Sequence, residues 1–231
     1  MKQLLKVIAM VALLCLPQAV QAHRDITEAD RATLEMVNGK TKEGYIYDYW
    51  FNADKLGQQN FSFKFVTSKT GDKDDAYEYN IYDVKRITLA NPHDGMPAEW
   101  LPVTLAQFDY AKLMNLLTQM KHQLMGVAKR SDHAMLLTCQ VLVKSNLNDW
   151  ETQPATLWAL KFNGDALVYP VITDGRVDLD ALSHHLKGRR PQLVKYLKRY
   201  LKSGKRRKAV VKNPELLLDV YDQYLAENPT E

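Results

Sequence analysis

Residues 157–172 read Leu-Trp-Ala-Leu-Lys-Phe-Asn-Gly-Asp-Ala-Leu-Val-Tyr-Pro-Val-Ile, and this stretch decides the kind of fold to expect. Two strand-forming runs flank Asn163-Gly164, a pair of residues that tolerates the positive φ of a tight β-turn. The pattern is typical of a β-hairpin. An antiparallel sheet is therefore the framework that the segments on either side are expected to join.

Upstream of this hairpin, apolar and polar side chains alternate along several short runs, which predicts a small antiparallel sheet over residues 31–90. Strands are expected at 32–37, 43–51, 61–65, 77–81 and 84–89, with a hairpin turn at Asn38-Gly39 and a later strand at 136–143. Residues 91–106 contain Pro92, Pro97 and Pro102, which predict a connection with at most one short strand at 101–105.

Helices are expected in two places. Residues 109–127 carry apolar side chains at spacings of three and four, which predicts a central amphipathic helix. Near the C-terminus, Pro191, Pro214 and the acidic pair Asp178 and Asp180 are helix-start signals. The helices expected there cover 181–186, 192–202 and 215–226, with 205–208 as a loop.

Together these elements predict an α+β fold. It would hold a small antiparallel β-sheet or half-barrel at the N-terminal side, a central amphipathic helix, a further β-hairpin and a C-terminal helical segment. The expected parts are a signal peptide at 1–22, a β-rich part at 23–106, a helix-plus-hairpin part at 107–186 packing on it, and a basic helical segment at 187–231. The apolar and charged fractions, 46% and 25%, exclude a disordered or collagen-like chain.

The first 22 residues predict export. Two lysines precede the apolar run 7–16, Pro17 follows it, and Val20 and Ala22 supply small residues for cleavage near Ala22. The run is shorter than the roughly 20 residues that span a bilayer, so no transmembrane segment is expected in the mature chain. Leu14 before Cys15 argues against a lipid anchor. The expected location is the periplasm or the extracellular space.

The residues that commonly carry chemistry form no local constellation. The six histidines give no metal-ligand spacing, and there is no Gly-x-Ser-x-Gly elbow or glycine-rich phosphate loop. The carboxylates at 174, 178 and 180 are explained by a turn and a helix cap. Cys139 lies in the apolar strand 136–143, which predicts a packed, unreactive thiol. No catalytic residue, metal site or cofactor is therefore predicted.

The strongest functional signal is a run of positive charge. Residues 187–212 hold no Asp or Glu but twelve basic residues: Lys187, Arg189, Arg190, Lys195, Lys198, Arg199, Lys202, Lys205, Arg206, Arg207, Lys208 and Lys212. Such a run is either a solvated helix face or a contact surface for an anionic partner. The residues expected to bind that partner are Lys195, Lys198, Arg199, Lys202, Lys205, Arg206, Arg207 and Lys208.

Three functional hypotheses remain open. The first is a non-enzymatic binding or envelope-associated module whose basic segment meets an anionic polymer, a lipid headgroup or an envelope protein, with no nucleic acid expected. The second is a periplasmic enzyme of the hydrolase type, with a site assembled from residues distant in sequence. Its candidate residues are His93, His122, His133, Asp109 and Tyr110. The third is attachment to another exported protein through a sheet edge at 45–51 or 61–65, although packing in a core explains the aromatic side chains of these strands better. The oligomeric state stays open.

Two phrases give the chain a family resemblance. Val-Asn-Gly-Lys-Thr-Lys-Glu-Gly-Tyr-Ile at 37–46 and Tyr-Asn-Ile-Tyr-Asp-Val-Lys-Arg-Ile at 79–87 resemble the opening strand pair and the closing strand of small exported proteins of unknown function from Bacteroidota. The C-terminal part is similar too, with a charged helix followed by a Pro-Glu-Leu helix that ends in tyrosines. The resemblance implies an exported protein and supplies no catalytic residues.

Overall fold

The computed structural model describes residues 26–47, 62–70, 76–93, 95–106, 122–144 and 152–228. The expected signal peptide at 1–22 lies outside these residues. The strands are β1 (Arg31–Met36), β2 (Thr41–Tyr47), β3 (Ser62–Val66), β4 (Tyr77–Asn80), β5 (Val84–Leu89), β6 (Glu99–Leu105), β7 (His122–Arg130), β8 (Ala134–Lys144), β9 (Thr152–Phe162), β10 (Leu167–Thr173) and β11 (Arg176–Val177). The helices are η1 (Glu28–Asp30), η4 (Ile81–Asp83), α2 (Leu179–Leu186), α3 (Pro191–Leu201), α4 (Gly204–Lys212) and α5 (Leu216–Glu227).

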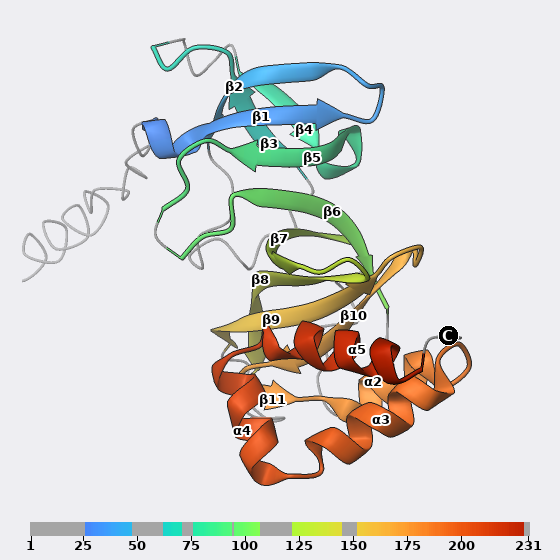
Figure 1. The fold of residues 1–231 in the computed structure, drawn as a ribbon. Helices are drawn as coiled ribbons and strands as arrows, with labels where there is room; N and C mark the ends of the chain where they lie inside the picture. Colours follow the sequence, from blue (N-terminus) through green and yellow to red (C-terminus); the bar gives the residue numbers. More distant parts are fainter. Residues whose placement is uncertain are drawn as a thin grey trace, which may run out of the picture.

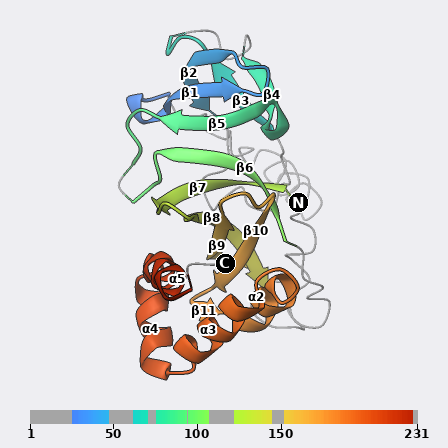
Figure 2. The same cartoon turned by 45° about the vertical axis from the view of Figure 1, so that its right-hand side comes forward.

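All these strands belong to one sheet, in the order β11-β10-β9-β8-β7-β6-β5-β1-β2-β3-β4. Strand β10 also pairs in parallel with β6, with Leu167 opposite Thr104, so β6–β10 close into a ring of strands. Figure 1 shows three tiers: the sheet of β1–β5, then the ring, then helices α2–α5 at the other end. The view turned by 45° keeps this order (Figure 2). The C-terminal helices therefore lie at the pole opposite β1–β5.

The predicted α+β fold, built on a small sheet and a central helix, is wrong. The described residues form a large, mainly antiparallel sheet of 11 strands, and the longer helices gather at the C-terminal end. The sheet is larger than expected because β6–β10 extend it beyond the first five strands. The short strand allowed at 101–105 is present as β6, which begins two residues earlier and includes Pro102.

The clearest correction falls on the helix expected at 109–127. Residues 109–121 lie outside the described part of the chain, and residues 122–127 belong to strand β7, which pairs with β6 and β8. Leu124 packs in the core of the N-terminal sheet, whereas Met125 packs inside the ring. A strand that is buried on both faces carries apolar residues at consecutive positions of the sequence. Consecutive apolar residues also occur along the apolar face of an amphipathic helix. Spacing alone could not separate these two structures.

Other local predictions are confirmed. Strands β9 and β10 form the hairpin at 157–172, and Gly164 in its turn has a φ of +82°. Asp178 caps α2 by accepting a hydrogen bond from the amide of Ala181 at 2.9 Å. Helices α3 and α5 lie within a residue or two of the predicted bounds. Cys139 is buried in the ring, and burial raises the pKa of its thiol to about 12, which keeps it protonated and unreactive.

Both strands proposed as docking edges lie inside the sheet, between neighbouring strands, over most of their described residues. Strand β2 pairs with β1 on one side and β3 on the other, and β3 in turn pairs with β4. Residues 48–51 and 61 of the two candidate segments lie outside the described part. Phe63 and Phe65 are buried in the core of this sheet, which confirms core packing as the explanation of these two aromatic side chains.

A ladder of ion pairs runs across the outer surface of β1, β5, β6 and β7. Glu35 accepts from Arg86 Nε at 2.9 Å and from Lys85 Nζ at 3.1 Å. Glu99 continues the ladder, 3.6 Å from Arg86 and 2.5 Å from Arg130. Opposite charges on adjacent strands stabilise the pairing of those strands. The ladder therefore ties the N-terminal sheet to the ring.

We expect Glu35→Gln to lower the melting temperature slightly at neutral pH and not in acid. Hydrogen bonds from Arg86 and then Lys85 hold the pKa of Glu35 below its ordinary value of 4.5. The lower pKa in the folded state means that the stabilisation is present above 4.5 and is lost as the pH falls below it. The effect is small because the pairs are exposed. Thermal unfolding of both proteins across this pH range checks it, and a constant difference would contradict it.

Candidate anion-binding surface

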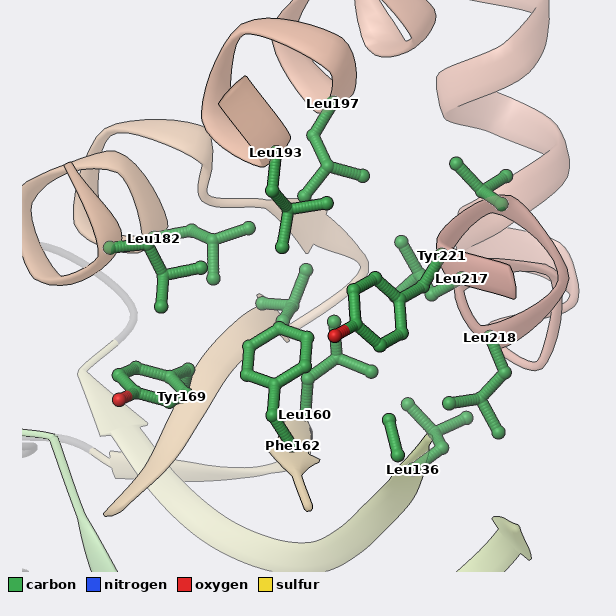
Figure 3. Packing of buried hydrophobic residues seen from close by; sticks show 14 of the residues in the cluster. Leu136, Leu160, Phe162, Tyr169, Leu182, Leu193, Leu197, Leu217, Leu218 and Tyr221 are labelled. Atoms are coloured by element: carbon green, nitrogen blue, oxygen red, sulfur yellow. The ribbon is translucent and has the colours of Figure 1, made fainter. Parts of the chain in front are cut away.

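The four C-terminal helices form a layer that is anchored on the ring by a shared apolar core. Each helix contributes buried side chains, and the hairpin β9–β10 supplies the other wall. Figure 3 shows Phe162 between Tyr169 and Tyr221, with Leu193 of α3 above it. Helix α3 turns Leu193, Val194, Leu197 and Leu201 into this core, which leaves its opposite side to solvent. The core therefore determines which face of α3 is exposed.

Two of the twelve basic residues, Arg189 and Arg190, contact side chains of the shared core and help to hold this layer in place. The guanidinium of Arg190 lies 4.8 Å from the ring of Phe162 and 3.5 Å from the Asp165 carboxylate, and it donates to the Tyr221 hydroxyl at 3.3 Å. Arg189 donates to the hydroxyl of Tyr169 at 3.5 Å. These two arginines therefore belong to the structural anchor.

The hydroxyl of Tyr169 completes the anchor by donating to Asp165 at 2.9 Å. Burial, followed by the neighbouring carboxylate, raises the pKa of Tyr169, so the hydroxyl stays protonated and can donate. Asp165 thus accepts from both Tyr169 and Arg190, which joins the β9–β10 turn to the start of α3. Sequence reasoning missed this anchor because its members become neighbours only when the hairpin packs on the helices.

The eight predicted binding residues all lie on the exposed side of α3, α4 and the turn between them. We call them the basic face: Lys195, Lys198, Arg199, Lys202, Lys205, Arg206, Arg207 and Lys208. On α3, residues 195, 198, 199 and 202 share one side because residues three and four apart are neighbours on a helix. No ion pair within the described part of the chain involves any of the eight.

Residues 205–208, predicted to be a loop, form the first turns of α4 instead. Lysine, arginine and alanine are good helix formers, and Val210 anchors the helix by burying its side chain. This correction matters for the surface, because a helix holds the four consecutive cations in fixed positions. In Figures 1 and 2, α3 and α4 lie at the end of the molecule away from β1–β5.

The basic face does not stabilise the fold by itself. Like charges three and four residues apart repel one another on α3. Helix α4 begins with cations and has no acidic residue in its first turn, although the positive end of a helix dipole favours acidic residues there. Ser203 at its N-cap makes no capping hydrogen bond through its side chain. Lys198 and Arg199 in the last turn of α3 do complement the negative end of its dipole. Repulsion among the cations and their position at the start of α4 act in the opposite direction, so a stabilising role does not explain the face as a whole.

The histidines proposed for a hydrolase site are not brought together. His122 begins β7, where it contacts the hydroxyl of Thr104 at 3.1 Å and the ring of Tyr82. His133 lies in the turn that follows the opposite end of the same strand. His93 lies in the β5–β6 connection, and Asp109 and Tyr110 lie outside the described residues. Within the described part, no group of three His, Cys, Asp or Glu side chains could hold a metal ion.

No family model, curated protein or solved structure matches this chain. The resemblance to exported proteins of Bacteroidota, carried by residues 37–46 and 79–87, therefore stays a prediction. None of the described helices is both long and apolar enough to cross a membrane.

Proposed function

We propose that the protein is a non-enzymatic module of the cell envelope that attaches to an anionic surface through the basic face. The observation that carries this proposal is the set of eight exposed cations with no acidic partner among the described residues. A purely solvated face would gain from interspersed acidic residues, whereas residues 187–212 contain none. Arg189 and Arg190, which also belong to the basic run, serve the anchor and are not part of this face.

The physical basis of binding is electrostatic. Each lysine or arginine close to an anionic membrane surface contributes about 1 kcal/mol, so several acting together give reversible attachment. The helical layer adds rigidity, because α3 and α5 share one apolar core with the ring. Export through residues 1–22 is part of the same proposal, since it would bring the basic face to the envelope.

The test is binding to vesicles of phosphatidylcholine with phosphatidylglycerol, measured by co-sedimentation over a range of salt concentrations. Lys195, Lys198 and Lys202, all replaced by Gln, should weaken binding on the order of 100-fold at low salt. Wild-type binding should fall steeply as salt shortens the range of electrostatic attraction, which is about 10 Å at 0.1 M.

A matched control removes the same charge elsewhere. Lys40, Lys69 and Lys85 are exposed lysines of the N-terminal sheet region, and replacing all three by Gln should leave vesicle binding within a fewfold of wild type. Equal losses in the two triple variants would show that net charge alone matters. Binding that does not respond to salt, or no binding at low salt, would reject the proposal.

A further inference from the structure

Two arginines of the basic face are held against tyrosine rings. The guanidinium carbon of Arg206 lies 4.6 Å from the centre of the Tyr200 ring, and that of Arg199 lies 5.8 Å from the centre of the Tyr196 ring. Tyr196 and Tyr200 are one helical turn apart on α3, which makes them neighbours. Contacts with aromatic faces attract cations and restrict their movement. The two guanidinium groups are therefore partly ordered before any ligand binds.

Both arginines lie close together, because their ring partners Tyr196 and Tyr200 are one turn apart on α3. Burial and then Glu227 raise the pKa of the Tyr196 hydroxyl, whereas the positive charges of Arg199 and Arg206 act in the opposite direction. Arg206 comes from α4 and Arg199 from α3, so this pair joins the two helices of the basic face. Arg207, the third arginine of the face, has no ring contact among the described residues.

A guanidinium that lies against a ring still presents its N–H edge to a ligand. That edge is a planar fork which matches two oxygens of a phosphate group, whereas a lysine ammonium acts as a point charge. Ordering by the ring reduces the entropy lost when the fork binds. Arg199 and Arg206 are therefore suited to direct hydrogen bonds with phosphate. The lysines around them contribute electrostatic attraction to any anionic ligand.

The same contacts argue against a polymer that stacks rings on the tyrosines. Arg206 covers one face of Tyr200, and Tyr196 contacts both Arg199 and Tyr224, the latter at 5.2 Å between ring centres. Bases and sugars need open aromatic faces on which to stack. Across the described residues, the large apolar side chains with high exposure are Val37, Tyr77 and Tyr82, all far from α3 and α4 in sequence. The basic face thus offers charge and hydrogen bonds without an apolar wedge for insertion.

We propose that the basic face docks on the phosphate layer of an anionic phospholipid bilayer, with Arg199 and Arg206 as the residues that bind lipid phosphate directly. This inference rests on the proposed function and adds to it a partner and two specificity-determining residues. The lysines supply the attraction that brings the protein to the surface. The protein then lies on the headgroups with α3 and α4 against the membrane and β1–β5 farthest from it (Figure 1).

The decisive variants keep the charge and change only the shape of the cation. Arg199→Lys combined with Arg206→Lys should weaken binding to phosphatidylglycerol vesicles roughly tenfold, because two planar forks are lost. Arg207→Lys is the matched control and should bind within twofold of wild type. Tyr200→Leu retains every cation but releases Arg206, and it should weaken binding in the same direction. Circular dichroism verifies that each variant is folded.

A soluble polyanion without lipid, such as dextran sulfate, distinguishes the partner. Tighter binding to the polymer than to vesicles at equal salt would overturn the bilayer as partner. If the double Arg→Lys variant binds vesicles like wild type while the lysine triple variant loses binding, the phosphate forks are rejected and the proposed function stands. If neither variant differs from wild type, both proposals fail.

Discussion

Phe162→Ala should lower the free energy of unfolding by about 3–5 kcal/mol, the usual cost of removing a large aromatic side chain from a packed core. The side chain of Phe162 is fully buried and meets the rings of Tyr221 and Tyr169, at 4.8 and 5.6 Å between ring centres. It also supports the guanidinium of Arg190. The substitution therefore opens a cavity and loosens the anchor of the helical layer in one step (Figure 3).

Urea unfolding followed by circular dichroism measures this loss. Phe162→Leu is the control, since it keeps most of the apolar volume and should cost about 1–2 kcal/mol. The difference in unfolding free energy between the two variants separates the effect of the cavity from the effect of losing the aromatic side chain. A loss below about 1.5 kcal/mol for Phe162→Ala would mean that strands β6–β10 and the C-terminal helices do not share one apolar core.

Gly44→Ala should destabilise the protein by about 3 kcal/mol or more, because the new methyl group has no room. A Cβ atom at Gly44 would lie 2.2 Å from the carbonyl oxygen of Val66 and 2.6 Å from the ring of Phe65. The oxygen belongs to the backbone of β3, so relief requires separating β2 from β3. The residue is thus glycine because the backbone of β3 and the Phe65 ring approach it closely.

The control for this substitution is Gly204→Ala at the start of α4, where a Cβ atom would meet nothing within 4 Å. Alanine is the better helix former, so Gly204→Ala should be neutral or slightly stabilising. Thermal unfolding of the two variants beside wild type provides the comparison. Wild-type stability in Gly44→Ala would contradict the pairing and register of β2 with β3.

Local signals predict the elements whose structure is decided locally. Asn163-Gly164 predicts the β9–β10 hairpin because a tight turn needs residues that tolerate positive φ, and Gly164 has that φ. Asp178 and Pro191 likewise predict the starts of α2 and α3. In each case the deciding residues lie within a few positions of the element they determine.

The closure of the ring could not be predicted in this way. Leu167 of β10 pairs with Thr104 of β6, and nothing near either residue signals the other. Strand β7 was mistaken for the end of a helix because both of its faces are buried, one against each core. The size of the sheet follows from these long-range contacts, so the fold class was wrong although most short elements were right.

On the candidate surface too, local features can be predicted from the sequence and long-range contacts cannot. The run of charge predicts the eight residues of the basic face, and all eight are exposed on α3, α4 and the turn between them. The run of charge does not reveal that Arg190 contacts Asp165, because this contact spans 25 positions of the sequence. The helical state of 205–208 was also missed, and its available signals were the helix-forming residues and Ser203 before them.

The central claim, that the basic face is a contact surface, is tested most directly by mapping lysine reactivity with and without vesicles. An amine-reactive reagent followed by mass spectrometry reports the exposure of each lysine in wild-type protein. On vesicles containing phosphatidylglycerol, Lys195, Lys198, Lys202, Lys205 and Lys208 should react severalfold more slowly, while Lys40 and Lys85 keep their rates. Unchanged rates at the five lysines under conditions in which the protein is bound, or protection confined to the N-terminal sheet, would contradict the account.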